Sequence, residues 1–197
     1  MRGKMIKKTL GLILLVSSIC STAFASEMQE KAQVLKVIKN YTSSVACGLD
    51  EITLKDIFTI DRDAELGSST YYVLWSGDMG CNLGSGTHSS YVSEVTRYSN
   101  TRPFLIMGDD AFNNEKNWVI DNEHNVIKAG INFRFIQSVK QISPSEFHII
   151  SWGYADEKFG GKDGGNNFPA NKFKYTLNLV DGEGWQITNQ QLLEQNN

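Results

Sequence analysis

The residues that could do chemistry are concentrated in one stretch, Gly77–Ser90, which reads GDMGCNLGSGTHSS. Asp78, Cys81 and His88 are the residue types of a thiol nucleophile and its base, because an imidazole beside a cysteine favours the reactive thiolate. The stretch lacks the lysine of a phosphate-binding loop and the G-x-S-x-G pattern of a nucleophile elbow. Two interpretations therefore remain: a small hydrolase site at these three residues, or a tight structural turn.

Whether a thiol could react depends on the compartment, and the first 25 residues indicate export from a bacterial cell. Basic residues precede an apolar run from Leu10 to Val16, and Ala23–Ala25 is the small-x-small pattern that signal peptidase cleaves. The apolar run is shorter than the roughly 20 residues that span a bilayer. Ile19 precedes Cys20, where a lipoprotein signal has a small residue. We expect residues 1–25 to be a cleaved signal peptide and the mature chain to be periplasmic or secreted.

Export favours a disulfide over a catalytic thiol. Without the leader the chain has two cysteines, Cys47 and Cys81, and thiols outside the cytoplasm oxidise and stay paired. We predict a Cys47–Cys81 disulfide that fixes the glycine-rich turn to the end of the preceding helix, and no catalytic residue in the turn. Its glycines are expected to provide positive φ angles in a tight connection: Gly77, Gly80, Gly84 and Gly86.

The other polar residues match no metal or cofactor signature. The three histidines lie in separate segments, without the i, i+4 spacing of a helical zinc pair. Two acidic stretches, residues 61–65 and 156–167, lack the glycine and glutamate positions of a calcium-binding EF-hand. We therefore expect no metal and no cofactor. Two carboxylate pairs have the residue types of glycoside hydrolysis, with no feature that marks either as active: Asp109 with Asp110, and Asp121 with Glu123.

A long segment between two expected strands, SWGYADEKFGGKDGGNNFP, carries aromatic residues at its edges. Its loop of about 15 residues is longer than ordinary hairpin loops, and long loops are often functional. Aromatic side chains on a glycine- and asparagine-rich loop suit recognition of a protein or glycan surface. The alternative is a flexible insertion without a role. The predicted binding residues are Trp152, Tyr154, Phe159 and Phe168.

Both regions need elements to position them, and the pattern of apolar residues predicts an α+β fold. Residues 28–46 have a helical period with apolar side chains at three- and four-residue steps: Met28, Ala32, Leu35, Ile38, Tyr41 and Val45. Residues 52–61 are compatible with a helix or a strand. Short runs rich in β-branched and aromatic residues follow and predict strands, among them residues 131–142 and residues 171–180, which alternate most cleanly. Residues 143–145 and 181–184 have the composition of hairpin turns. We predict one domain over residues 26–197, in which an N-terminal amphipathic helix packs on a mostly antiparallel β-sheet with one disulfide.

The charge of the chain narrows the class of partner. The leader contains four of the 19 Lys and Arg residues and none of the 22 Asp and Glu residues, so the mature chain has a net charge of −7 with neutral histidines. Nucleic acids and anionic lipids are bound mainly through Lys and Arg. We therefore expect no nucleic-acid partner and no stable membrane insertion after cleavage.

These patterns favour a small exported binding module without enzymatic activity, which would present a surface to a partner protein or to the cell envelope. In outline the chain is similar to the envelope inhibitors of lysozyme and to immunity proteins that neutralise envelope-targeted toxins, which share the outline of an exported protein with one small β-rich domain. This similarity is architectural and assigns no residue. The alternative is a small envelope hydrolase with its site near Asp78, Cys81 and His88.

Overall fold

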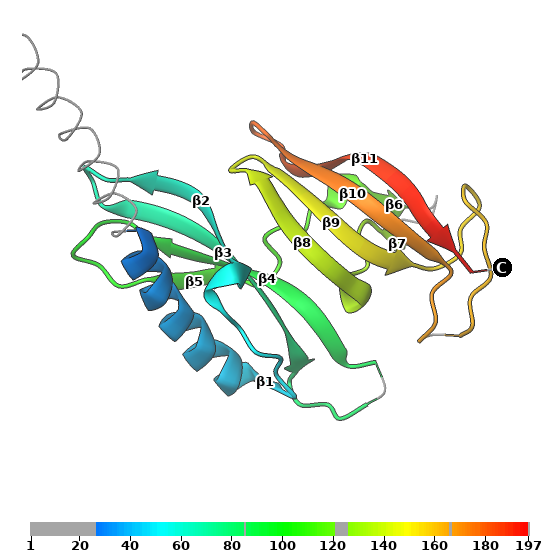
Figure 1. Cartoon of the computed structure of the whole chain (residues 1–197), viewed down its shortest axis with the longest axis horizontal. Helices are drawn as coiled ribbons and strands as arrows, with labels where there is room; N and C mark the ends of the chain where they lie inside the picture. Colours follow the sequence, from blue (N-terminus) through cyan, green and yellow to red (C-terminus); the bar gives the residue numbers. More distant parts are fainter. Residues whose placement is uncertain (1–26, 85, 121–125, 166, 197) are drawn as a thin grey trace, which may run out of the picture.

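The computed structural model describes residues 27–84, 86–120, 126–165 and 167–196. The expected signal peptide lies outside these residues, and so does the carboxylate pair Asp121 and Glu123. The described part contains one helix, over residues 27–45, and eleven strands in three sheets (Figure 1). All strands within the sheets pair antiparallel. The expected combination of one helix, antiparallel strands and one disulfide is therefore confirmed, although the strands form three sheets.

The first sheet has five strands and is built around β3 (Ser68–Met79) and β4 (His88–Arg97). Along one edge of β3, its beginning pairs with β2 (Ile57–Asp63) and its end pairs with β1 (Ala46–Cys47). On the other side, β4 pairs with β5 (Leu105–Gly108). This sheet therefore connects the end of the helix, through β1, to the glycine-rich turn between β3 and β4.

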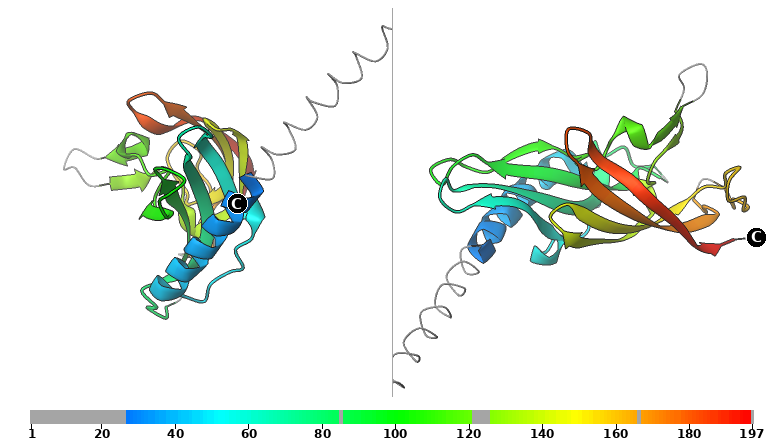
Figure 2. Two further views of the ribbon diagram at one scale, coloured as in Figure 1. Left: turned by 90° about the vertical axis from the view of Figure 1, so that its left-hand side faces the viewer. Right: turned by 90° about the horizontal axis from the view of Figure 1, so that it is seen from above.

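The second sheet is a meander of four strands: β8 (Ile136–Ser143), β9 (Glu146–Gly153), β10 (Asn171–Val180) and β11 (Gly184–Gln195). The third sheet is the hairpin of β6 (Trp118–Ile120) and β7 (Val126–Ala129), which projects from the body of the molecule (Figure 2). Three short 3-10 turns join the strands: η1 (Leu54–Asp56), η2 (Glu115–Asn117) and η3 (Phe133–Phe135).

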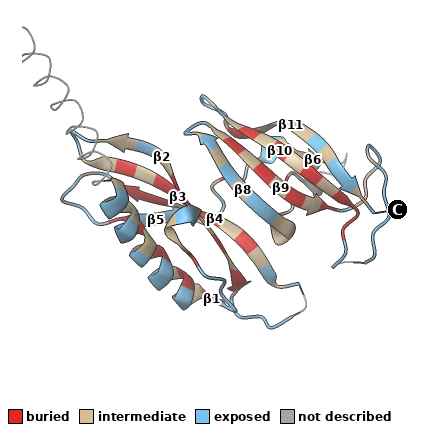
Figure 3. Ribbon diagram, in the orientation of Figure 1, coloured by how far each residue is buried: buried red, intermediate tan, exposed pale blue. Residues whose placement is uncertain are grey.

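The first sheet is covered on both faces, by the helix on one side and by the second sheet on the other (Figures 1 and 3). Along β3, Tyr71 and Val73 pack in one core with Val34 and Ile38 of the helix. Tyr72, between them, belongs to the other core, which the second sheet completes. A strand that is buried on both faces has no polar face to alternate with, which explains the unbroken apolar run at residues 71–75.

The core between the two larger sheets is aromatic. Phe112, Phe147 and Trp185 meet edge to face, with ring centroids 4.9 to 5.3 Å apart. The indole nitrogen of Trp185 donates a hydrogen bond of 3.0 Å to the hydroxyl of Tyr72. Edge-to-face pairs add to the free energy of area burial, and the buried indole needs such a partner. This core therefore fixes the second sheet, and the loops at its ends, against the first.

The buried side of the helix differs from the predicted stripe. Val34, Ile38 and Thr42 are buried, whereas Met28 is 38% exposed and Ala32 is exposed as well. The prediction was wrong at Met28 and Ala32 because the first turns of the helix contact the sheet through polar groups. There, Glu30 accepts hydrogen bonds from side chains of β2 and β3, and no apolar stripe is required.

Three short segments also differ from expectation. Residues 52–61 contain both alternatives, because the turn η1 leads directly into β2. Residues 126–129 form β7, which the sequence did not suggest. Residues 133–135 form η3 instead of a strand, because the side chain of Asn132 accepts a hydrogen bond from the backbone N–H of Arg134 and begins a turn. The turns expected at residues 143–145 and 181–184 do join β8 to β9 and β10 to β11.

Candidate functional site

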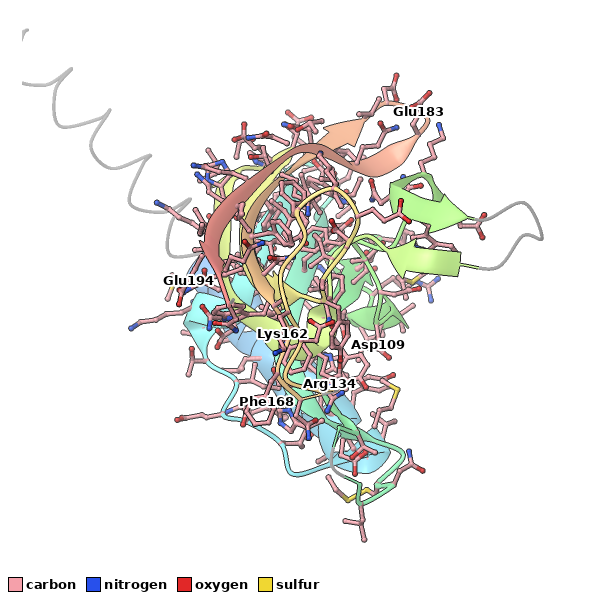
Figure 4. The ribbon with its side chains drawn as sticks, turned by 90° about the vertical axis from the view of Figure 1, so that its right-hand side faces the viewer. Asp109, Arg134, Lys162, Phe168, Glu183 and Glu194 are labelled. Atoms are coloured by element: carbon pink, nitrogen blue, oxygen red, sulfur yellow. A yellow bond between two sulfur atoms is a disulfide. The ribbon has the colours of Figure 1, made fainter. Side chains whose placement is uncertain are left out.

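The glycine-rich turn is closed by a disulfide between Cys47 and Cys81, which confirms the predicted pairing (Figure 4). The two cysteines are 34 residues apart in the sequence. Cys47 lies in β1, where it pairs with Asp78 while Ala46 pairs with Met79. The disulfide therefore fixes the turn between β3 and β4 to the strand that directly follows the helix.

The glycines of this turn have two different roles. Gly80 and Gly86 have positive φ angles of 79° and 111°, as predicted. The prediction was wrong for Gly77 and Gly84, which are not among the residues with positive φ. A Cβ on Gly77 would lie 2.8 Å from Leu49, so this glycine permits close packing instead. Among the other described residues of the turn, Cys81 and Leu83 also have positive φ.

Asp78, Cys81 and His88 do not form a thiol–imidazole pair in this structure. The sulfur of Cys81 is bonded to Cys47. The carboxylate of Asp78 accepts a hydrogen bond of 2.8 Å from the backbone N–H of Leu83, and this bond, more than any other cause, lowers the pKa of Asp78. His88 is exposed and lies 3.7 Å from the carboxylate of Asp50. Asp78 therefore shapes the turn, and its loop contains no free thiol.

Two of the four predicted binding residues, Trp152 and Phe168, line one surface depression of about 280 Å³, which we call the aromatic hollow. Phe168 is 64% exposed. Tyr154 lies beside the hollow and meets the ring of Phe135 edge to face, with centroids 6.1 Å apart. The hollow is lined by Phe135, Trp152, Asn167, Phe168, Pro169 and Asn196.

Phe159 lies apart from the other three. Its ring packs on Phe173 of the core, with centroids 4.9 Å apart. The segment that carries it is held to the adjoining strands, because Asn171 donates a hydrogen bond of 2.9 Å to the carbonyl of Gly160 and Gln195 donates one of 2.8 Å to the carbonyl of Phe159. This part of the loop is therefore built into the fold, in contrast to the alternative of a flexible insertion.

Two cations lie over the rings of the aromatic hollow. The guanidinium of Arg134 is 5.0 Å from the ring centroid of Phe135, and its nitrogen also donates a hydrogen bond to the side chain of Asn167. The ammonium of Lys172 is 5.6 Å from the ring centroid of Trp152. Arg134 also approaches the glycine-rich turn, since a Cβ on Gly86 would lie 2.3 Å from its guanidinium. The hollow and the turn therefore adjoin at Arg134 (Figure 4).

The acidic stretches serve as turns. Asp63 accepts hydrogen bonds from the backbone N–H groups of Glu65 and Leu66, and Asp156 accepts one from Phe159. Among the described residues, no three His, Cys, Asp or Glu side chains gather as ligands for a metal ion. No helix in the described part of the chain has the length and apolar character to cross a bilayer.

A second concave site, which sequence reasoning missed, lies where the three sheets meet. This junction cavity has a volume of about 240 Å³. Its walls come from β4, the segment after β5, β6, η3 and β11, and they include Tyr91, Asp109, Phe112, Trp118, Phe133 and Ile187. Asp109 and Asp110 both line it. Of the two carboxylate pairs noted in the sequence, this is the pair that lies within the described residues.

Asp109 links the junction cavity to the helix. One of its carboxylate oxygens accepts a hydrogen bond from the hydroxyl of Tyr41, and the other accepts one of 2.5 Å from Ser93. Trp75 in turn donates a hydrogen bond of 2.8 Å to Ser93. Burial, together with the hydrogen bond to Asp109 and its negative charge, raises the pKa of Tyr41 to about 12. Ser93 is fully buried, so its hydroxyl holds the carboxylate of Asp109 in position and is not accessible to a substrate.

A comparison of the chain with protein-family models, with curated proteins and with solved structures finds no match. The function must therefore be argued from the arrangement of the residues themselves.

Proposed function

We propose that this protein is a periplasmic or secreted binding module that recognises a partner protein of the cell envelope through the aromatic hollow, as an inhibitor or an immunity-type protein does. The observation that supports this proposal is the convergence of aromatic side chains from separate segments: Trp152 from β9, Phe168 from the loop before β10, and Phe135 from η3. Large aromatic side chains contribute most to the binding energy of protein interfaces, where they fill pockets on the partner.

The charges around the aromatic hollow suggest the kind of partner surface. The mature chain has a net charge of −7 with neutral histidines, yet Arg134 and Lys172 both lie over rings of the hollow. A partner with carboxylates around an apolar contact would complement this pattern, and such complementarity mainly increases the association rate and the specificity. The alternative of a hydrolase site at Asp78, Cys81 and His88 is supported less, because the sulfur of Cys81 is in a disulfide.

Export is part of the proposal and has its own measurement. Mass spectrometry of the protein recovered from the periplasm or the medium is expected to find Ser26 at the N-terminus, because cleavage is expected after Ala25. A mature chain that begins at a lipid-modified Cys20 would contradict this expectation, as would a chain that keeps its leader.

The test of the hollow is a binding measurement with a matched pair of variants. The mature protein is used to isolate its partner from envelope extract, and the purified partner is then titrated against Phe168→Ala and Leu66→Ala. Both side chains are similarly exposed, at 64% and 67%, but Leu66 lies at the β2–β3 hairpin. We expect Phe168→Ala to weaken binding by about tenfold or more and Leu66→Ala to change it little. Equal binding by the two variants would contradict the proposed surface.

A further inference from the structure

The walls of the junction cavity are held in place by the surrounding core. Tyr91 stacks on Trp75, with centroids 4.4 Å apart and ring planes 24° from parallel. Phe112 is held edge to face against Phe147 and Trp185 of the aromatic core. The cavity wall therefore contains aromatic rings that are held in place, as binding sites for small ligands commonly do.

The charged groups that line the cavity are negative. Asp109 and Asp110 are both on its wall, and of the described residues that line it none is Lys, Arg or His. Each oxygen of Asp109 has one hydrogen bond, from Ser93 or from Tyr41. Because a carboxylate oxygen can accept two hydrogen bonds, Asp109 retains capacity for a ligand.

A lysine that adjoins the cavity wall in the sequence is itself paired. Lys116, next to the lining residue Asn117, pairs with Glu183 at 3.0 Å. Burial, followed by the negative charges of Asp78 and Asp109, raises the pKa of Tyr91. Two carboxylates beside aromatic faces therefore create a negative field around a partly apolar space.

From this geometry we propose that the junction cavity binds an organic cation, whose ammonium or guanidinium group lies between the carboxylates of Asp109 and Asp110 and the faces of the aromatic walls. Such faces attract cations through the ring quadrupole, most strongly where water is excluded. A volume of about 240 Å³ corresponds to about eight water molecules of liquid. It therefore suits a small alkylammonium molecule, or the side chain of a partner's lysine or arginine.

This site is distinct from the aromatic hollow and goes beyond the proposed function. The turn η3 separates the two, because Phe133 lines the cavity and Phe135 lines the hollow. A variant at Phe168 can therefore test the hollow without removing a wall of the cavity.

The experiment compares a cation with a neutral molecule of the same shape. The mature, disulfide-bonded protein is titrated with choline and, separately, with 3,3-dimethyl-1-butanol, and the indole N–H signal of Trp118 is followed by NMR. Nα-acetyl-lysine amide and Nα-acetyl-arginine amide, whose side chains keep their positive charge, are tested in parallel as models of a partner's side chain. We expect saturable shifts with at least one cation, at an affinity at least about tenfold above that of the neutral alcohol. Saturation by choline indicates a free small molecule, and saturation by the amides alone indicates a side chain.

Three variants complete the experiment. Asp110→Asn, on an exposed side chain, is expected to weaken cation binding by about tenfold, and Asp109→Asn by at least as much. Asp61→Asn removes an equal charge from an exposed position on β2 and is expected to leave binding unchanged. Phe168→Ala is expected to leave it unchanged too, which separates this proposal from the proposed function.

The proposal would be overturned by equal affinities of the alcohol and the tightest-binding cation, or by no saturation with any of the three cations. Unchanged cation binding in every folded variant of Asp109 and Asp110 would overturn it as well. Because Asp109→Asn also alters the contacts to Tyr41 and Ser93, its fold is checked by circular dichroism. Asp110→Asn keeps the test decisive if Asp109→Asn does not fold.

Discussion

At the scale of single residues, the sulfur of Cys81 distinguishes a structural turn from a reactive loop. Because Cys47 and Cys81 are bonded, thiol alkylation of the native protein is expected to label neither residue before reduction. A disulfide between residues 34 apart restricts the unfolded chain, so Cys81→Ser is expected to lower the free energy of unfolding by about 3–4 kcal/mol in urea titrations. Rapid labelling of Cys81 in the native protein would instead support the catalytic thiol.

The candidate sites could be predicted only where their residues are close in the sequence. Trp152 and Phe168 were singled out because they flank one long loop, and both line the hollow, while their role in binding stays a prediction. Phe159 was indistinguishable from them in composition, and only the fold shows that it packs on the core. Asp109 was noted as a carboxylate, but its hydrogen-bond partner Tyr41 is 68 residues away. No local pattern in the sequence indicates a contact between residues so far apart.

At the scale of elements, a partly buried ionic cluster fixes the start of the helix to the first sheet. Glu30 accepts hydrogen bonds from Arg62 of β2 and from Tyr71 of β3, at 3.0 and 2.7 Å, and lies 3.3 Å from Arg97 of β4. Burial acts to raise the pKa of Glu30, but these hydrogen bonds and the positive charges outweigh it, so the pKa is lowered. The ionised form of Glu30 therefore stabilises the folded state.

The lowered pKa predicts a dependence of stability on pH. The contribution of Glu30 is complete above the pKa of the unfolded chain, about 4.3, and is lost as the pH falls through the lower pKa of the folded state. We therefore expect Glu30→Gln to be less stable than the native protein at pH 7, and the difference to shrink in acid. Urea unfolding at a series of pH values measures it, with the exposed Glu51→Gln as control. A difference that stays constant down to pH 2 would contradict the role of Glu30.

The elements that could be predicted are those in which the pattern of apolar and polar side chains follows their burial. β10 matched its alternation over residues 171–178 because one of its faces is buried and the other is not, whereas Leu179, expected on the buried face, is 44% exposed. The helix was identified, but its buried side was placed wrongly at Met28, because the contact there is made by charged and polar groups. β7 has four residues, Val126–Ala129, and within the described residues it pairs with β6. So short a pattern does not stand out in a sequence.

At the scale of the whole molecule, the first sheet belongs to both cores. Val73 on one face of β3 packs toward the helix, and Tyr72 on the other packs toward the second sheet. Apolar runs in the sequence indicate that strands are buried, but they do not show how the strands are divided among sheets. One sheet was therefore expected, and the described residues form three. Because both cores depend on β3, we expect residues 26–197 to unfold as a single domain, as the length of the chain suggests.

This expectation can be tested by removing atoms from one core and measuring the other. Ile38→Ala creates a cavity between the helix and the first sheet, and Ile149→Ala creates one between the two larger sheets. Each is expected to lower the free energy of unfolding by about 2–5 kcal/mol. In native-state hydrogen exchange, Ile38→Ala should also reduce the protection of the slowest amides of β10 by the same free energy. β10 does not belong to the core that contains Ile38, but global unfolding exposes both cores together. Faster exchange limited to the helix and the first sheet, with β10 unchanged, would show that the second sheet unfolds independently.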